Sequence, residues 1–180
     1  TLIHPYDNDQ IIAGAGTAAY ELLKEIPDLD IIMTPVGGGG LISGSCIAAK
    51  GLNPKITIYA AEPERANDAY RSFHSGQIEH NQHPDTIADG LRTDLCNRTL
   101  TIIRTNVKEI LVVTEEAIIS AMQFIWGRMK IVIEPSSAVP IAAVFTYPDL
   151  FTHHKVGIIL SGGNIELEEQ VVTTAKKAGI

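Results

Sequence analysis

The sequence is short of cysteine and of positive charge, and both shortages exclude classes of function. Only two cysteines occur in 180 residues, Cys46 and Cys96, and neither forms a Cys-x-x-Cys pair or keeps metal-ligand spacing with a histidine. Lysines and arginines number 14 against 21 acidic residues, a net charge of −7, and the longest basic cluster is Lys176-Lys177. We therefore expect no nucleic-acid partner. We interpret the cysteines as unpaired thiols in a reducing compartment, the cytoplasm.

Long apolar runs are missing as well. No run approaches the ~20 residues that a membrane span needs, and the first five residues have neither the charged nor the apolar region of a signal peptide. We expect no membrane partner. The chain does contain 45% hydrophobic and 19% charged residues, enough apolar residues to fill a globular core. It does not start with methionine, so we expect a piece of a longer protein.

Short apolar runs alternate with helical patterns along the chain. The apolar runs predict buried strands over residues 31–36, 55–61, 109–113 and 155–160. Helical spacing predicts helices over about 8–26, 41–49, 99–106, 114–129 and 137–147, a polar helix or turn over 64–75, and a last helix after residue 164. This alternation predicts an α/β fold with an open, mostly parallel sheet and helices on both faces.

Helix ends, core positions and close packing can also be predicted. We expect Asn8 or Asp9 to cap the first helix, and Ser136 to cap the helix over 137–147. The segment 14–19 matches Gly-x-Gly-x-x-Ala but follows no strand, so we interpret its small residues as allowing close helix packing rather than dinucleotide binding. The helix over 114–129 carries core candidates at helical spacing: Ile118, Ile119, Met122, Ile125 and Met129.

Four consecutive glycines, Gly37 to Gly40, join a predicted strand to a predicted helix of small residues. Glycine allows positive φ and close approach of a ligand, so the N–H groups of this loop can converge on an anion at the helix N-terminus. No Gly-Lys-Ser/Thr follows, which favours a monophosphate over a triphosphate with Mg²⁺. The alternative interpretation is a flexible loop or tight turn.

A second glycine-bearing loop starts at Ser161, after the last predicted strand. Ligands of open α/β sheets bind at the carboxyl ends of strands, so both loops are expected at one edge. The motifs that carry a family resemblance are Pro-Val-Gly-Gly-Gly-Gly-Leu at 35–41, Ala-Glu-Pro at 61–63, Ala-Asp-Gly at 88–90, Ile-Glu-Pro at 133–135 and Leu-Ser-Gly-Gly-Asn at 160–164. In order and spacing, over nearly the whole chain, they resemble fold-type II pyridoxal-phosphate (PLP) enzymes of the serine racemase and serine/threonine dehydratase branch.

The resemblance implies a set of cofactor contacts. The phosphate would be held by the backbone N–H groups of Gly37, Gly38, Gly39 and Gly40, with Leu41 beside them. Ser161 would face the pyridine nitrogen, and a neutral hydroxyl there would be compatible with expelling a β-hydroxyl from the substrate. Glu134 would lie close to the ring edge, although it could instead act as an acidic residue at the start of the next helix.

The resemblance also implies a cation site and a nucleotide effector. Glu62, the backbone carbonyl of Ala66 and Asp68 keep the spacing with which this branch binds Mg²⁺ or Ca²⁺, and carboxylate and carbonyl oxygens suit such cations. The alternative is two acidic surface residues. A nucleotide effector would contact Lys130 and Asn164.

Two segments of the family are absent from the chain. The cofactor-binding lysine of the family lies in a Ser-Phe-Lys segment, and the substrate carboxylate binds a Ser-Ser-Gly-rich loop; neither occurs here. We therefore expect residues 1–180 to be the C-terminal portion of the large PLP-binding domain, with residues 1–9 as the hinge from a missing small domain. The expected partners are the missing N-terminal portion of the same enzyme, a small amino-acid substrate and a second copy in a homodimer.

Two functions remain open from the sequence. The first is a PLP-dependent ammonia-lyase, or dehydratase, that acts on serine, threonine or 3-hydroxyaspartate, with racemase activity as a further outcome. This chain alone would then be inactive, because it supplies cofactor contacts and not the lysine. The rival is a non-catalytic phosphate-ligand-binding or regulatory module. A Ser-Phe-Lys segment in the upstream coding sequence would decide for the enzyme.

Overall fold

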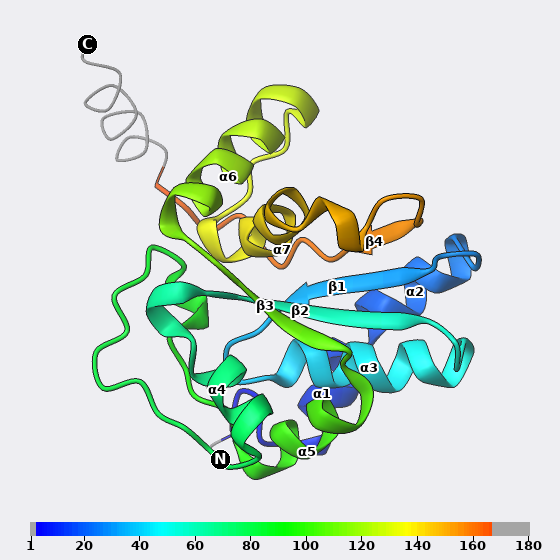
Figure 1. Ribbon diagram of the computed structural model, residues 1–180. Coiled ribbons are helices and arrows are strands. Elements are labelled where there is room, and N and C mark those ends of the chain that lie inside the picture. Colours follow the sequence, from blue (N-terminus) through cyan, green and yellow to red (C-terminus); the bar gives the residue numbers. More distant parts are fainter. Residues whose placement is uncertain (1–2, 167–180) are drawn as a thin grey trace.

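The protein is built around a four-stranded parallel sheet (Figure 1). Its structure is a computed structural model that describes residues 3–166. The strands are β1 (Ile31–Pro35), β2 (Thr57–Pro63), β3 (Glu109–Val113) and β4 (Val156–Ile158), in the spatial order β3-β2-β1-β4. Every recorded pairing is parallel, with Ile31 opposite both Thr57 and Val156. The predicted last helix lies outside the described residues.

Helices cover both faces of the sheet (Figure 1). One face carries α1 (Asp9–Ala15), α2 (Thr17–Glu25), α3 (Gly40–Leu52), α4 (Asp68–Ser75) and α5 (Asn97–Asn106), and the other carries α6 (Glu115–Met129) and α7 (Pro135–Thr146). Three short 3₁₀ helices complete the described elements: η1 (Glu64–Ala66), η2 (Asp89–Leu91) and η3 (Pro148–Leu150). The predicted fold class is confirmed. Among residues 3–166, no helix combines the length and the apolar character that crossing a membrane requires.

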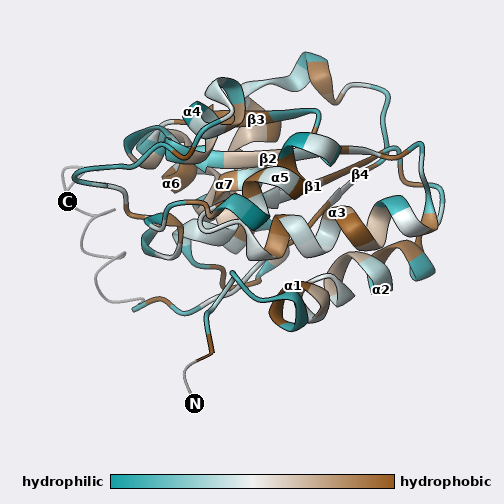
Figure 2. Ribbon diagram, turned by 90° about the horizontal axis from the view of Figure 1, so that it is seen from below, coloured by the Kyte–Doolittle hydropathy of each residue, from teal (hydrophilic) through white to brown (hydrophobic). Residues whose placement is uncertain are grey.

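Two apolar cores follow from the alternation of side chains along the strands. In β1, Ile31 and Met33 join the core under α6 and α7, whereas Ile32 joins the core under α2, α3 and α5. Apolar strand residues lie between the helices in Figure 2. Because the sheet is covered on both faces, the strands read as continuous apolar runs rather than as alternating ones.

The predicted helix over 8–26 divides in two at Gly16. Asn8 caps its start, since its Oδ1 accepts hydrogen bonds from the N–H groups of Gln10 and Ile11. A Cβ built on Gly16 would lie 2.7 Å from the carbonyl oxygen of Gly44 in α3. The expected close helix packing at the Gly-x-Gly segment is therefore present between α1–α2 and α3.

Other expectations need correction. Ser136 is not the cap of α7: Glu134 holds the N-cap position, Pro135 is the first helical residue, and the Ser136 Oγ accepts a hydrogen bond from Gly90 N–H instead. Proline suits this first position because an N–H there would have no acceptor within the helix. Met129 is 54% exposed at the end of α6 and is not a core residue. Strand β4 ends at Ile158, two residues earlier than expected.

Candidate functional site

A cavity of about 360 Å³ lies at the carboxyl edge of the sheet. Its walls come from the loop after β1, the loop after β4, the start of α7 and the segment around Gly90. The structure places all seven residues predicted to contact the cofactor around this one cavity: Gly37, Gly38, Gly39, Gly40, Leu41, Glu134 and Ser161. Segments more than a hundred residues apart in the sequence thus meet because parallel strands end at the same edge.

The glycine loop is closely packed by its surroundings. Gly39 has φ +86°, in the left-handed region, and occupies the N-cap position of α3. A Cβ built on Gly39 would lie 2.7 Å from the Cβ of Thr99, and one built on Gly37 would lie 3.0 Å from the Cα of Leu91. The loop therefore requires glycine both for its backbone conformation and for the space around it.

The N–H groups of the loop are buried and free to bind an anion. Within residues 3–166, no backbone or side-chain acceptor is recorded for the N–H groups of Gly37 to Gly40, and all four residues are buried. Buried N–H groups without a partner are rare in native structures. The 13-residue helix α3 adds the positive end of its dipole at the same place. No lysine or arginine lines the cavity in the described part of the chain, so the backbone supplies the attraction for an anion.

The opposite wall is fixed to the start of α7. The N–H of Gly162 donates to the Ser137 Oγ at 3.0 Å, and the N–H of Asn164 donates to the Glu134 carboxylate at 2.9 Å. The Glu134 N–H in turn donates to the Gly162 carbonyl at 3.1 Å. Glu134 makes no side-chain capping bond to its own helix. Its carboxylate instead orders the loop that carries Ser161 at the mouth of the cavity.

Several lining residues were not predicted from the sequence. They are Pro5, Tyr6, Pro35, Gly90, Leu91, Thr93 and Ser136. Gly90 lies in the Ala-Asp-Gly motif that supports the resemblance, and this motif was the available signal for its neighbours Leu91 and Thr93. The sequence predicted a helix cap at Ser136 and placed Tyr6 in the hinge over residues 1–9, so neither was expected in the cavity.

Tyr6 covers the glycine loop from outside. A Cβ built on Gly38 would overlap the Tyr6 ring, and one built on Gly40 would lie 2.8 Å from the Tyr6 Cβ. Burial, and then the negative charge of a Cys96 thiolate, raise the pKa of the Tyr6 hydroxyl. Arg98 in α5 holds the following residues, because its Nε donates to Asp7 at 2.8 Å and its Nη1 to Asp9.

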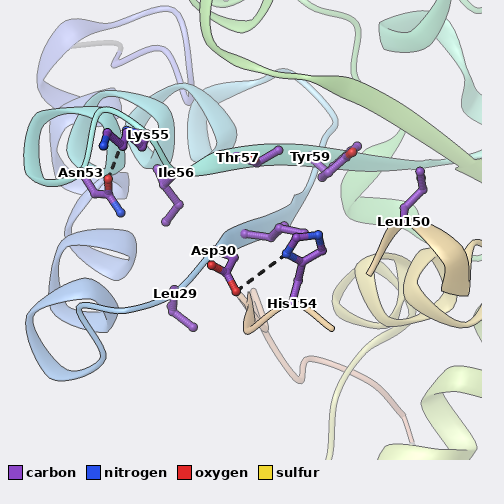
Figure 3. A pocket seen from close by; sticks show the side chains of 10 residues that line it. Leu29, Asp30, Asn53, Lys55, Ile56, Thr57, Tyr59, Leu150 and His154 are labelled. Atoms are coloured by element: carbon purple, nitrogen blue, oxygen red, sulfur yellow. Dashed lines mark hydrogen bonds and ion pairs between the residues drawn. The ribbon is translucent and has the colours of Figure 1, made fainter. Parts of the chain in front are cut away.

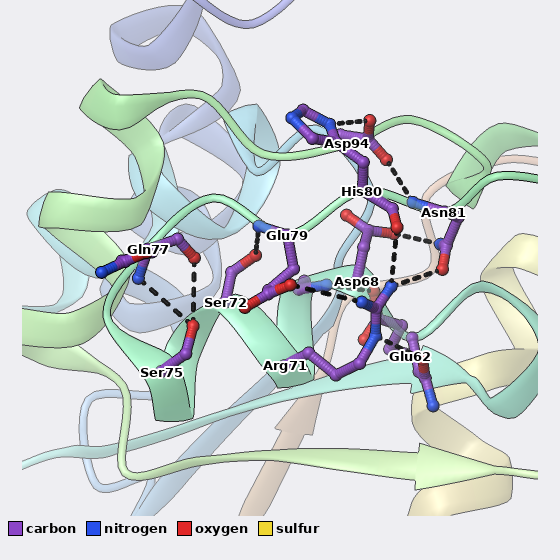
Figure 4. A network of polar contacts seen from close by, with 12 residues as sticks. Glu62, Asp68, Arg71, Ser72, Ser75, Gln77, Glu79, His80, Asn81 and Asp94 are labelled. Atoms are coloured by element: carbon purple, nitrogen blue, oxygen red, sulfur yellow. Dashed lines mark hydrogen bonds and ion pairs between the residues drawn. The ribbon is translucent and has the colours of Figure 1, made fainter.

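Two residues of the predicted cation site are seen in Figure 4, Glu62 near the end of β2 and Asp68 at the start of α4. Glu62 and Asp68 are fully buried, so the alternative of two acidic surface residues is wrong. Glu62 accepts hydrogen bonds from the N–H groups of Ala69 and Tyr70 at 2.9 and 2.8 Å. Asp68 Oδ1 accepts one from Asn81 Nδ2 at 2.5 Å, whereas its Oδ2 has no partner among the described residues.

Burial and neighbouring acidic groups raise the pKa of both carboxyls. Burial, and then the neighbouring Asp68, raise the pKa of Glu62 well above its usual range. Burial, and then Asp94, raise the pKa of Asp68 to about 7. Ala66 is buried in η1 between them in sequence. Oxygen donors and an unpartnered buried carboxylate atom fit a hard cation. No cluster of three or more histidine, cysteine or acidic side chains suited to a metal occurs in residues 3–166.

The fold and the first cavity define a class: an α/β domain that binds a phosphate-bearing ligand through a glycine loop at the carboxyl edge of its sheet. The sequence profile of the family described as "Pyridoxal-phosphate dependent enzyme" matches residues 1–162. The chain belongs to this family.

Individual relatives are similar over nearly the whole chain. Serine racemase from Dictyostelium discoideum is 53% identical over 170 residues, which are 92% of this chain and 52% of the relative. L-threo-3-hydroxyaspartate ammonia-lyase from Saccharomyces cerevisiae is 45% identical over 177 residues, 98% of this chain and 54% of the relative. The solved structure of maize serine racemase has a TM-score of 0.91 at 39% identity, covering 99% of this chain and 56% of that one. The chain thus spans about half the length of these relatives.

Proposed function

We propose that the chain supplies the cofactor-phosphate and ring-nitrogen contacts of a PLP-dependent ammonia-lyase, or dehydratase, for a β-hydroxy amino acid. The observation that carries this proposal is the meeting of the buried, unpartnered N–H groups of Gly37 to Gly40 with Ser161 around one cavity. The names of relatives, serine racemase and L-threo-3-hydroxyaspartate ammonia-lyase, support the substrate class and a racemase activity beside the lyase activity.

Each wall of the cavity has a distinct task in this proposal. The glycine N–H groups and the start of α3 hold the dianionic phosphate through charge-assisted hydrogen bonds. Ser161 places a neutral hydroxyl at the ring nitrogen, and Glu134 fixes the Ser161 loop through its bond from Asn164 N–H. PLP, when bound, withdraws electrons from the bonds at the substrate α-carbon and so permits loss of the β-hydroxyl.

The remaining parts of the site would come from the missing N-terminal portion of the same enzyme. No lysine lines the cavity in the described residues, and the covalent lysine is therefore expected elsewhere in the longer protein. Strand β4 lies at the edge of the sheet, and no strand of residues 3–166 pairs with its outer side. A run as apolar as 156–160 is typical of a strand buried between neighbours. We place a strand of the missing portion beside β4.

A second copy of the chain would cover an apolar surface formed by α6, α7 and the segment between them. The exposed residues there are Phe124, Met129, Ile131, Val132 and Phe145, each more than 40% exposed. The rings of Phe124 and Phe145 pack edge to face, with centroids 5.1 Å apart. Contiguous exposed apolar residues mark interaction sites. Sedimentation analysis tests the proposed homodimer: Phe145→Glu should give monomers, and an unchanged sedimentation coefficient would place the interface elsewhere.

A nucleotide effector and a cytoplasmic location complete the proposal. The implied contacts, Lys130 and Asn164, are exposed, and Asn164 N–H binds the Glu134 carboxylate that lines the cavity. A ligand at Asn164 would therefore act next to the cofactor loop. ATP titration of the parent and of Lys130→Gln tests this: equal affinities would remove Lys130 from the effector site.

Mg²⁺ or Ca²⁺ would bind Glu62, the carbonyl of Ala66 and Asp68. The support is the unpartnered Asp68 Oδ2, the burial of both carboxyls and the repulsion by which Asp68 helps to raise the pKa of Glu62. A bound cation would neutralise this repulsion and join the end of β2 to the start of α4.

The complete protein that carries this chain provides the test of the enzyme. We expect it to contain bound PLP and to release ammonia and a keto acid from L-serine, L-threonine or 3-hydroxyaspartate. Ser161→Ala removes one hydrogen bond, about 0.5 to 1.5 kcal/mol net, so most PLP should stay while the rate falls. Ser120→Ala, on the exposed side of α6, is the matched control. Bound PLP without turnover on any of the three substrates would favour the regulatory module.

A further inference from the structure

A second cavity lies at the opposite, amino edge of the sheet and has a volume of about 270 Å³ (Figure 3). Its walls are the turn that leads into β1, the turn and first residues of β2, and the segment between η3 and β4. It shares no lining residue with the cavity at the glycine loop. A ligand bound here would be separate from the cofactor.

Asp30 and Lys55 carry opposite charges and face this cavity without pairing with each other. Asp30 Oδ2 accepts a hydrogen bond from Lys155 N–H at 2.8 Å and lies 3.8 Å from His154 Nδ1 (Figure 3). Lys55 is exposed, and its Nζ has no hydrogen-bond or ion-pair partner among residues 3–166. The lining therefore presents a carboxylate and an ammonium group at separate places.

Two hydroxyl groups of β2 also line the cavity and are free to form hydrogen bonds with a ligand. Tyr59 is only 8% exposed and packs edge to face on Phe151, with ring centroids 5.5 Å apart. Neither its hydroxyl nor that of Thr57 has a hydrogen-bond partner within the described residues. Neither hydroxyl oxygen is fully buried, so both are open to a ligand in the cavity. Both side chains point to the same face of β2, because they are two residues apart.

We propose that this cavity binds a small zwitterion, a free α-amino acid, at a site distinct from the cofactor cavity. The carboxylate of the ligand would pair with Lys55 and accept a hydrogen bond from Thr57 or Tyr59, while its ammonium group would pair with Asp30. A simple anion would be repelled by Asp30, and a simple cation by Lys55. The volume falls just below the roughly 300 to 1,000 Å³ of typical ligand pockets, so the ligand is small.

The test follows binding by NMR, with L-alanine as the probe and the complete protein treated with borohydride to block chemistry at the cofactor. We expect L-alanine to shift the amide signals of Thr57 and Tyr59. Lys55→Gln should weaken the affinity for L-alanine about tenfold, because it removes one charge-assisted hydrogen bond. Lys24→Gln, a substitution in α2 outside the cavity, should leave affinity unchanged.

Three outcomes would overturn the proposal. The first is a response confined to the amides of Gly37 to Gly40, which would place the amino acid in the cofactor cavity. The second is equal affinity in Lys55→Gln and the parent protein. The third is an affinity for acetate or for methylammonium equal to the affinity for L-alanine, since a zwitterion site needs both charges of its ligand. Because a protein that binds no PLP would still contain this cavity, the result is independent of the proposed enzyme activity.

Discussion

Alanine in place of Gly39 should destabilise the protein, because this residue combines a left-handed backbone with a crowded environment. Its φ is +86°, a region that residues with a Cβ rarely adopt. An added Cβ would also lie 2.7 Å from the Thr99 Cβ and 2.8 Å from the Leu95 Cδ2, and both contacts are shorter than real Cβ atoms make. Either the loop or the start of α5 must then move.

The expected loss can be bounded from the two causes. The left-handed conformation costs an L-residue about 1 to 2 kcal/mol, and overpacking costs about 1 to 3 kcal/mol. We therefore expect Gly39→Ala to lower the free energy of unfolding by about 2 to 5 kcal/mol, a large share of the roughly 5 to 15 kcal/mol typical of a domain.

A second glycine of the same helix provides the control. Gly51 lies near the end of α3, and a Cβ built on it would meet nothing within 4 Å. Gly51→Ala should raise the free energy of unfolding by about 0.5 to 1 kcal/mol, since alanine is the better helix former. Urea denaturation of both variants of the complete protein measures the difference. Equal stability of Gly39→Ala and the parent would show that Gly39 is not left-handed, and the geometry of the phosphate loop would then be wrong.

Three further predictions concern the cation site, the thiols and the residue above the glycine loop. Mg²⁺ or Ca²⁺ at a hundred times its dissociation constant should stabilise the protein by about 2.7 kcal/mol. Asp68→Ala should abolish this stabilisation, whereas Glu64→Gln, at an exposed residue, should not. If the stabilisation survives in Asp68→Ala, the cation binds elsewhere. Burial raises the pKa of Cys46 to about 12, so only half-buried Cys96 should react with iodoacetamide at pH 8, and mass spectrometry showing label on Cys46 in the folded protein would contradict its burial. Tyr6→Phe should retain PLP because the ring still covers the loop, whereas Tyr6→Ala should lose it faster during dialysis; equal loss would mean that the ring does not protect the cofactor.

The fold was predictable because its determinants are local. Runs such as 31–35 and 109–113 are apolar and short, and each is followed by a turn and a helical pattern. A sheet covered on both faces produces such runs, whatever the order of its strands. The strand order β3-β2-β1-β4 itself was not predicted, since no local pattern encodes which strands pair.

The cavity was predictable where a motif marks it, and not where distant contacts create it. Gly39 and Ser161 follow strands, and strand ends share an edge in a parallel sheet. Tyr6 precedes the first helix and reaches the glycine loop only through the folding of the chain. Ser136 looked like a cap because serine favours that position, but its hydroxyl is used by the N–H of Gly90, 46 residues away.

The cation residues show the same limit. The family resemblance implied the pair Glu62 and Asp68, but not their burial, which depends on packing among β2, α4 and the segment around Asn81. Met129 followed the helical spacing of its neighbours and still lies on the surface, because α6 extends past the core at its end.

The central claim is that the N–H groups of the glycine loop bind the phosphate of the cofactor. NMR of the cofactor-stripped complete protein tests this claim directly, by comparing the amide signals of Gly37 to Gly40 during titration with PLP, with pyridoxal, which lacks the phosphate, and with inorganic phosphate. We expect PLP and inorganic phosphate to shift these amides strongly, because charge-assisted hydrogen bonds form there, and pyridoxal to shift them little. Glycine amides that stay in place while PLP binds would contradict the account, since the phosphate would then lie elsewhere.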